Sequence, residues 1–177
     1  MENCLILHGT GGHDKENWFP WLKNELNKMG IKTKVPNFPN SDKPILEDWL
    51  RKLEEYDITE ETILIGHSLA CPLILRLLEK GRKIKAAYLV ATFIDDLGWD
   101  VLKESNFFSE SFNWEEIKKN CNHFEVFTSK NNPYLKIEHG QEVADKLNVK
   151  NQVLDVYKHF NMKEFPFLLE EIKKLWN

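Results

Sequence analysis

Short apolar segments alternate with amphipathic segments along almost the whole chain, and this alternation restricts the fold more than any other feature. The apolar segments span residues 4–7, 32–35, 62–65, 86–92, 124–128 and 152–157. Several lack polar residues at alternate positions, which is typical of parallel strands covered on both faces. The intervening segments, residues 18–29, 45–56, 69–80, 114–119, 141–147 and 165–175, have the pattern of amphipathic helices. The sequence therefore predicts an α/β fold with a doubly wound, six-stranded parallel sheet, strand order 2-1-3-4-5-6, and helices on both faces.

Length, charge and cysteine content narrow the class of protein. A chain of 177 residues is most simply one domain, residues 1–177. The net charge of −4, with acidic and basic residues mixed, argues against a nucleic-acid surface. No signal-peptide pattern or 18-residue apolar run is present, so we expect no membrane association. Three cysteines, odd in number and two of them in or beside apolar stretches, indicate reduced thiols and a cytoplasmic protein: Cys4, Cys71 and Cys121.

The segment ILIGHSLACP, residues 63–72, carries the first chemical signal. It has the pattern of a strand, a tight Gly-x-Ser-x-Ala turn and a helix, with Ser68 at the centre of the turn. In a nucleophile elbow, small residues two before and two after the serine let strand and helix approach. Ala70 stands where glycine is usual and adds only a methyl group. The alternative is that Ser68 caps the helix through its hydroxyl, and the pattern alone leaves both interpretations open.

A glycine-rich turn, HGTGG at residues 8–12, follows the first apolar segment. A phosphate-binding loop would end in Gly-Lys-Ser/Thr, but residues 13–15 are His-Asp-Lys. A dinucleotide-binding turn would need a third glycine at the position of Asp14. Nucleotide binding therefore ranks low, and no cofactor is expected.

An oxyanion hole explains this turn better. Free backbone N–H groups of Thr10 (or Gly11) and of Leu69 would together stabilise a developing negative charge. Strands one and three are neighbours at the switch point of the predicted sheet, where ligands bind outside the carboxyl ends. The glycine turn and Ser68 would then face each other across one crevice.

A general base for Ser68 is expected at the end of a later strand, and His159 follows the last one. The other histidines have structural interpretations, as turn, loop or helix-start residues: His8, His13, His67, His123 and His139. The spacing of histidine and aspartate in HGTGGHD matches no familiar metal-ligand pattern, so no metal is expected.

The third catalytic position, after the fifth strand, holds Asn132 followed by Pro133 where an acid would be expected. The order Ser68, Asn132, His159 nevertheless agrees with that of α/β-hydrolases. Either Asn132 orients His159 in a slow enzyme, or Asp95 or Asp96 after strand four substitutes, or hydrolysis has been lost. Asp155 is a poorer candidate, because four residues along a strand span about 13 Å at 3.3 Å each.

The longest irregular segment, residues 95–113, contains four aromatic residues that could line an apolar substrate pocket: Trp99, Phe107, Phe108 and Phe112. Connections of this length are more often functional than idle. The alternative is that these side chains only cover the edge of the sheet, and the sequence does not decide between the two.

Taken together, these residues resemble the small serine hydrolases of the retinoblastoma-binding protein 9-like family. The resemblance covers nearly the whole chain, through HGTGG, ENWFPWL, PILEDWL, GHSLACPLILRLLE, FNWEEIKKNCNHFEVFTSKNNP, GQEVADKL and YKHF. It implies a minimal α/β-hydrolase core without a large cap domain, with Ser68 as nucleophile and His159 as base. The aspartate of the family falls at Asn132, and its second elbow glycine at Ala70.

Two functions follow as hypotheses. The first is a carboxylesterase-like serine hydrolase that cleaves a small ester, or an amide, without metal or cofactor, its activity reduced by Asn132. In a serine-protease triad, asparagine at the acid position costs roughly 10⁴ in turnover but leaves about 10³–10⁴ over water. The second is a binding or protein-interaction module on the same fold, since fold alone does not fix function.

Overall fold

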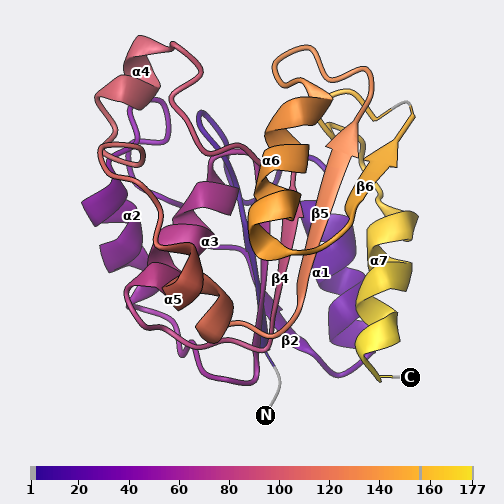
Figure 1. Cartoon of the computed structure of the whole chain (residues 1–177). Coiled ribbons are helices and arrows are strands. Elements are labelled where there is room, and N and C mark those ends of the chain that lie inside the picture. Colours follow the sequence, from indigo (N-terminus) through magenta and orange to yellow (C-terminus); the bar gives the residue numbers. More distant parts are fainter. Residues whose placement is uncertain (1–2, 156, 177) are drawn as a thin grey trace.

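The computed structural model describes residues 3–155 and 157–176, which contain one six-stranded sheet in which every pairing is parallel (Figure 1). The sheet order is β2-β1-β3-β4-β5-β6. This order and the all-parallel pairing confirm the predicted fold class. The strands are β1 (Asn3–Leu7), β2 (Lys32–Lys34), β3 (Thr62–His67), β4 (Ala86–Val90), β5 (Phe124–Ser129) and β6 (Asn151–Leu154).

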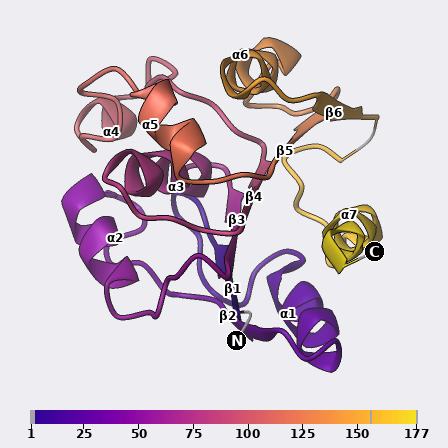
Figure 2. The same cartoon turned by 60° about the horizontal axis from the view of Figure 1, so that its bottom comes forward.

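Helices cover both faces of the sheet (Figure 2). Helices α1 and α7 lie on one face, and α2, α3, α5 and α6 lie on the other. The helices are α1 (Phe19–Lys28), α2 (Leu46–Leu53), α3 (Ala70–Glu79), α4 (Asp100–Lys103), α5 (Trp114–Lys119), α6 (Ile137–Leu147) and α7 (Pro166–Lys173), followed by a 3₁₀ turn, η1 (Lys174–Trp176). None of those in the described ranges is both long and apolar enough to cross a bilayer.

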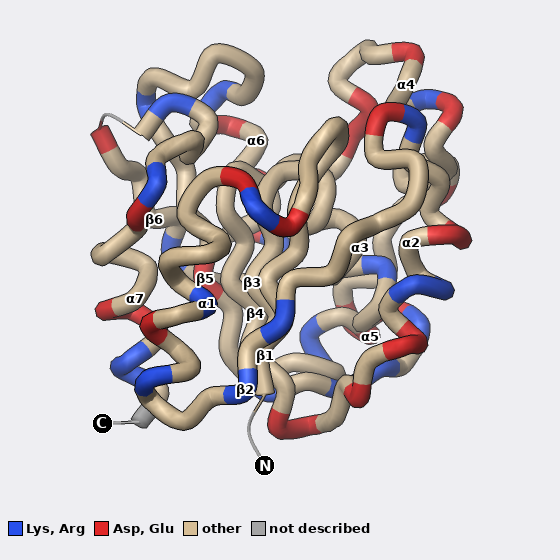
Figure 3. Tube along the Cα trace, turned by 180° about the vertical axis from the view of Figure 1, so that it is seen from behind, with Lys and Arg blue, Asp and Glu red and all other residues tan. Residues whose placement is uncertain are grey.

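The core lies at the middle of the sheet. Strands β3 and β4 are buried along their whole length and contain no lysine, arginine, aspartate or glutamate. Helix α3 runs directly from the end of β3 and is itself buried from Ala70 to Leu78. Charged residues of both signs are interspersed over the peripheral segments (Figure 3). The turn between β3 and α3 is therefore held between fully buried elements.

The structure differs from the predicted elements mainly at their ends. Helix α6 begins at Ile137 rather than at residue 141, because the His139 side chain accepts the Lys136 N–H and Gly140 lets the helix pack against Thr128. The segment 95–113, expected to be irregular, contains the short helix α4. The strand predicted over residues 152–157 ends at Leu154, and Val156 lies outside the described residues.

Candidate active site

The turn between β3 and α3 has the geometry of a nucleophile elbow. Ser68 has a φ of +57°, a left-handed conformation that is uncommon for serine, and its N–H donates to the carbonyl oxygen of Val90 at 2.9 Å. The N-cap of α3 is Leu69, and no side chain caps it. The capping alternative for Ser68 is therefore not what the structure contains. Its side chain is half-buried and borders a pocket.

Two glycines permit this turn. A Cβ on Gly66 would lie 3.0 Å from the backbone carbon and oxygen of Ala70, so α3 approaches β3 closely only because glycine is there. A Cβ on Gly9 would lie 2.8 Å from the Ser68 Cβ and 3.3 Å from the Leu69 nitrogen. The glycine-rich turn after β1 therefore packs directly against the elbow, as expected from the adjacency of β1 and β3.

The hydrogen bonds of the glycine-rich turn show which of the candidate oxyanion donors are free. The Gly11 N–H donates to the Ser41 carbonyl at 2.8 Å and is therefore occupied. No acceptor within the described ranges takes the N–H of Thr10 or of Leu69. Of the two alternatives at the glycine turn, Thr10 thus retains a free donor beside the Leu69 N–H.

His8 supports the same turn from behind and has a structural role. Its Nδ1–H donates to the Gly9 carbonyl at 2.9 Å, and its Nε2 accepts the Phe38 N–H at 3.0 Å. Both ring nitrogens are therefore used. Burial lowers the pKa of the His8 imidazole, which favours this neutral form. Within the described ranges, no group of three or more histidine, cysteine, aspartate or glutamate side chains comes together as a metal site.

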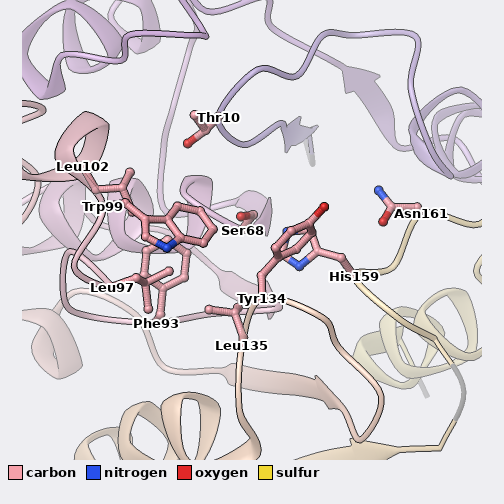
Figure 4. Close-up of a pocket in the computed structure, with 10 residues that line it drawn as sticks. All are labelled: Thr10, Ser68, Phe93, Leu97, Trp99, Leu102, Tyr134, Leu135, His159 and Asn161. Carbon is pink, nitrogen blue, oxygen red and sulfur yellow. The ribbon is translucent and has the colours of Figure 1, made fainter.

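His159 lies in the loop after β6 and lines the same pocket as Ser68 (Figure 4). Two bonds tie this loop to the end of β5: the Tyr157 N–H donates to Ser129 Oγ at 3.0 Å, and the Lys158 N–H donates to Asn131 Oδ1 at 2.7 Å. The backbone on either side of His159 has positive φ, +48° at Lys158 and +58° at Phe160. The conformation of the loop is thus imposed by its surroundings.

His67 holds the backbone of His159 in place. His67 Nε2 lies 2.7 Å from the carbonyl oxygen of His159. Because a carbonyl only accepts, Nε2 carries the proton, and the buried Nδ1 of His67 has no partner among the described residues. Burial lowers the pKa of His67 to about 4. Burial also lowers the pKa of His159, to about 3, and the nearby His67 adds to this effect. Both rings are therefore neutral near pH 7.

Asn132 is brought to His159 as the sequence predicts, and its amide orientation is defined. Asn132 Oδ1 accepts the backbone N–H groups of Tyr134 at 3.0 Å and Leu135 at 3.2 Å. The amide nitrogen Nδ2 then donates to His159 Nδ1 at 3.1 Å. This bond requires an unprotonated Nδ1, with the ring proton of His159 on Nε2. In the other tautomer, Nδ1–H donates to Asn132 Oδ1, which lies 3.2 Å away. A general base towards a serine needs the opposite tautomer, with a free Nε2.

The alternative acids make other contacts. Asp95 Oδ1 accepts the Leu97 N–H at 2.7 Å, and Asp96 Oδ1 accepts the Gly98 N–H at 2.8 Å, so each carboxylate closes a turn in its own loop. Asp155 forms an exposed ion pair with Lys130 at 2.5 Å. No carboxylate of the described residues contributes to the pKa shift of His159.

The pocket beside Ser68 has a volume of about 300 Å³. One part of its lining is polar and consists of Thr10, Ser68, His159 and Asn161. The rest is apolar or aromatic and consists of Phe93, Leu97, Trp99, Leu102, Tyr134 and Leu135. Small, mainly apolar cavities with a few convergent polar groups are the usual form of ligand sites.

Of the four aromatic residues predicted to line a pocket, the structure brings only Trp99 to it. Phe107 is fully buried and packs edge-to-face on Trp49, with ring centroids 5.6 Å apart. Phe112 lies 3.8 Å under the Arg76 guanidinium, and Phe108 packs behind Phe93. These three side chains pack within the fold instead, Phe107 on α2, Phe108 on Phe93 and Phe107, and Phe112 on Arg76 of α3.

The residues that sequence reasoning missed come mostly from positions next to predicted ones. Tyr134 and Leu135 directly follow Asn132 and Pro133. Their position next to the predicted acid site indicates that they line the same pocket. Phe93 and Leu97 flank the two aspartates after β4 in the same way. Leu102 is different, because only the unexpected helix α4 turns it into the pocket wall.

Comparisons with known proteins identify the family and the fold. The model of a family described as Serine hydrolase matches residues 4–175. Serine hydrolase RBBP9 of Rattus norvegicus is 33% identical over 176 residues, 97% of this chain and 94% of that protein. The putative hydrolase YdeN of Bacillus subtilis (strain 168) is 34% identical over 153 residues, 83% of this chain and 80% of that protein. The crystal structure of the ydeN gene product from B. subtilis superposes with a TM-score of 0.89 at 26% identity, covering 99% of both chains.

Proposed function

The chain belongs to the serine hydrolase family, and from this premise we propose that it cleaves a small neutral ester through a covalent intermediate on Ser68. The observation that carries the proposal is the left-handed Ser68 at the rim of a pocket that His159 also lines. The backbone N–H groups of Thr10 and Leu69, which have no acceptor among the described residues, support the same assignment.

In this mechanism, Ser68 Oγ attacks the ester carbonyl carbon while His159 Nε2 takes the hydroxyl proton. The N–H groups of Thr10 and Leu69 donate to the oxyanion. The bond to the leaving alkoxide breaks as His159 returns the proton to it, which leaves an acyl group on Ser68. A water molecule, deprotonated by His159, then releases the carboxylic acid and restores the serine.

Asn132 makes this reaction slow in our proposal, because the Nδ2 donor holds His159 in the tautomer whose Nε2 is already protonated. The active tautomer is a minor form in which Nδ1–H donates to Asn132 Oδ1, 3.2 Å away. Esters are favoured over amides for this reason, since an alkoxide leaves with less help from a proton donor than an amine does.

We also infer a reducing compartment such as the cytoplasm, since the three cysteines are buried free thiols. Burial raises the pKa of each of them, so none is an alternative nucleophile at neutral pH.

A second candidate function follows from Asn132 itself. A chain that lacks the acid could retain the pocket as a binding site and have no turnover. This hypothesis and the hydrolase proposal predict different behaviour towards a covalent probe of Ser68.

An active-site-directed fluorophosphonate tests the proposal. We expect one adduct per chain, located on Ser68 by mass spectrometry of the peptides, with prior heating of the protein abolishing it. Ser68→Ala should remove both the adduct and the hydrolysis of short-chain esters. Failure to label native Ser68 after prolonged incubation, together with unchanged behaviour of Ser68→Ala, would contradict the hydrolase and leave the binding module.

Gly9→Ala tests the oxyanion hole. The added methyl group would lie 2.8 Å from the Ser68 Cβ and 3.3 Å from the Leu69 nitrogen, so it displaces the donor pair. Because losing one oxyanion donor costs about 10²–10³ in kcat, we expect a decrease of at least 10². Steady-state kinetics measure it, with circular dichroism and Tm checking that the variant is folded. A folded variant with unchanged kcat would place the oxyanion elsewhere.

A further inference from the structure

Two exposed aromatic side chains face the pocket from different loops. Among the described residues, four large hydrophobic side chains are exposed: Met29, Trp99, Tyr134 and Val153. Trp99 and Tyr134, 43% and 57% exposed, are the two that line the pocket. Exposed apolar surface gathered at a concave site is typical of ligand contact, whereas single exposed residues need no explanation.

The two rings form a defined pair. Trp99 and Tyr134 meet edge-to-face, with centroids 6.0 Å apart and an interplanar angle of 89°. Tyr134 in turn stands edge-to-face on His159 at 5.0 Å. In Figure 4, Trp99 lies on one side of Ser68, and Tyr134 lies on the side of His159. The pair therefore connects the Trp99 side of the pocket with the His159 side.

Neither ring is on a loosely attached segment. The Trp99 N–H donates to the Asp96 carbonyl at 2.9 Å, and the Trp99 carbonyl accepts the Leu102 N–H at 2.9 Å. The Tyr134 N–H is held by Asn132 Oδ1. Backbone positions fixed before a ligand arrives lower the entropy cost of binding. The backbone positions of Trp99 and Tyr134 are thus preorganised, although their rings are exposed.

Chemistry assigns the two sides of the pocket to the two halves of an ester. His159 must return its proton to the leaving alkoxide, so the alcohol half lies on the His159 and Tyr134 side. The acyl half then extends to the opposite side of Ser68, where the wall is Phe93, Leu97, Trp99 and Leu102 (Figure 4). This assignment rests on the proposed function.

Size and charge limit what the acyl side accepts. At about 300 Å³, the whole pocket lies at the small end of the usual range of ligand sites, which disfavours a long acyl chain. No lysine, arginine, aspartate or glutamate is among the described residues that line the pocket. A charged acyl group would lose its hydration there without gaining a partner, whereas an aromatic ring would find edges and faces of other rings.

We propose that Trp99 and the apolar wall form a subsite for a neutral acyl group with one aromatic ring, such as an arylacetyl group, and that Tyr134 closes this subsite beside the alcohol. Hydrolysis of such an ester consumes one water and releases the arylacetic acid and the alcohol. Trp99 and Tyr134 are specificity-determining residues in this proposal.

A series of methyl esters tests the subsite, because the small alcohol is the same throughout. We expect kcat/KM for methyl phenylacetate to exceed that for methyl acetate, methyl hexadecanoate and anionic monomethyl succinate by about tenfold or more. It should exceed that for methyl cyclohexylacetate about threefold, since ring-on-ring contacts add to apolar burial. Equal values for phenylacetate and cyclohexylacetate, or a preference for the long or anionic acyl group, would overturn the proposal.

Variants assign the effect to the aromatic pair. In Trp99→Ala the ratio of kcat/KM for phenylacetate to that for acetate should fall about tenfold, and Trp99→Phe should restore most of it. Tyr134→Phe should keep the ratio, and Tyr134→Ala should lower it. Met29→Ala, an exposed hydrophobic residue at the end of α1, is the matched control and should leave it unchanged. An unchanged ratio in Trp99→Ala would refute the subsite.

Fluorophosphonate labelling separates this proposal from the function on which it depends. Labelling of Ser68 without any acyl preference overturns the subsite and leaves the hydrolase standing. Absence of both labelling and hydrolysis overturns the two together.

Discussion

Asn132→Asp is expected to raise kcat for ester hydrolysis at neutral pH by up to about 10⁴-fold, the factor that the reverse change costs a serine-protease triad. One oxygen of the new carboxylate would keep the two bonds that Asn132 Oδ1 makes to the Tyr134 and Leu135 N–H groups. The other would replace Nδ2, 3.1 Å from His159 Nδ1, and accept a proton where the amide now donates one. The ring proton then moves to Nδ1 and frees Nε2 for Ser68.

The same variant should change the pH profile. A carboxylate beside the imidazole stabilises its charged form, so the pKa of His159 should rise from the low value that burial imposes. The acid limb of kcat/KM should therefore move towards neutral pH together with the gain in rate, and a gain without this movement would point to another cause. Kinetics from pH 4 to pH 8 measure both.

Two further variants distinguish the competing explanation of the acid position. If Asp95 or Asp96 supplied the acid, Asp95→Ala or Asp96→Ala would abolish turnover and Asn132→Asp would change little. Because each of these carboxylates accepts an N–H of its own turn, we expect a modest decrease from loop distortion instead. Abolition by either alanine variant would contradict the assignment of Asn132.

The parts of the site that follow from strand order could be predicted from the sequence. An apolar run, a small-residue turn and a helix define where Ser68 lies. The order of the strands then brings Thr10 and His159 to the pocket that Ser68 lines, and Asn132 to His159. Local sequence pattern and sheet topology agree here, so the positions of these residues can be predicted without knowing how their side chains pack.

The pocket wall could not be predicted in the same way. Which aromatic residues of segment 95–113 turn inward depends on the short helix α4 and on Arg76, which binds the carbonyl oxygens of Phe107 and Glu110 from α3. These are long-range contacts with no periodic signal in the sequence. The role of His67 is hidden for a similar reason, because its partner is a carbonyl 92 residues away.

The buried histidines are expected to make stability strongly pH-dependent. His67 and His159 have pKa values of about 4 and 3 in the folded chain, against about 6.5 when unfolded. Between these values the unfolded state binds more protons, so the free energy of unfolding falls as the pH falls from about 7. Each histidine should lower the free energy of unfolding by about 2 kcal/mol at pH 5 relative to pH 7. This is a large share of the 5–15 kcal/mol that is typical of the free energy of unfolding of a native protein. Urea unfolding at pH 5, 6 and 7 measures it.

His67→Gln isolates one of these contributions. The glutamine amide can still donate to the His159 carbonyl, which His67 Nε2 now does at 2.7 Å, but it does not titrate. The slope of unfolding free energy against pH should therefore decrease by about 1 kcal/mol per pH unit between pH 5 and 6, approaching the 1.4 kcal/mol that one full proton carries. Equal slopes for the native chain and His67→Gln would mean that His67 is already charged in the fold, which its buried, unpartnered Nδ1 makes costly.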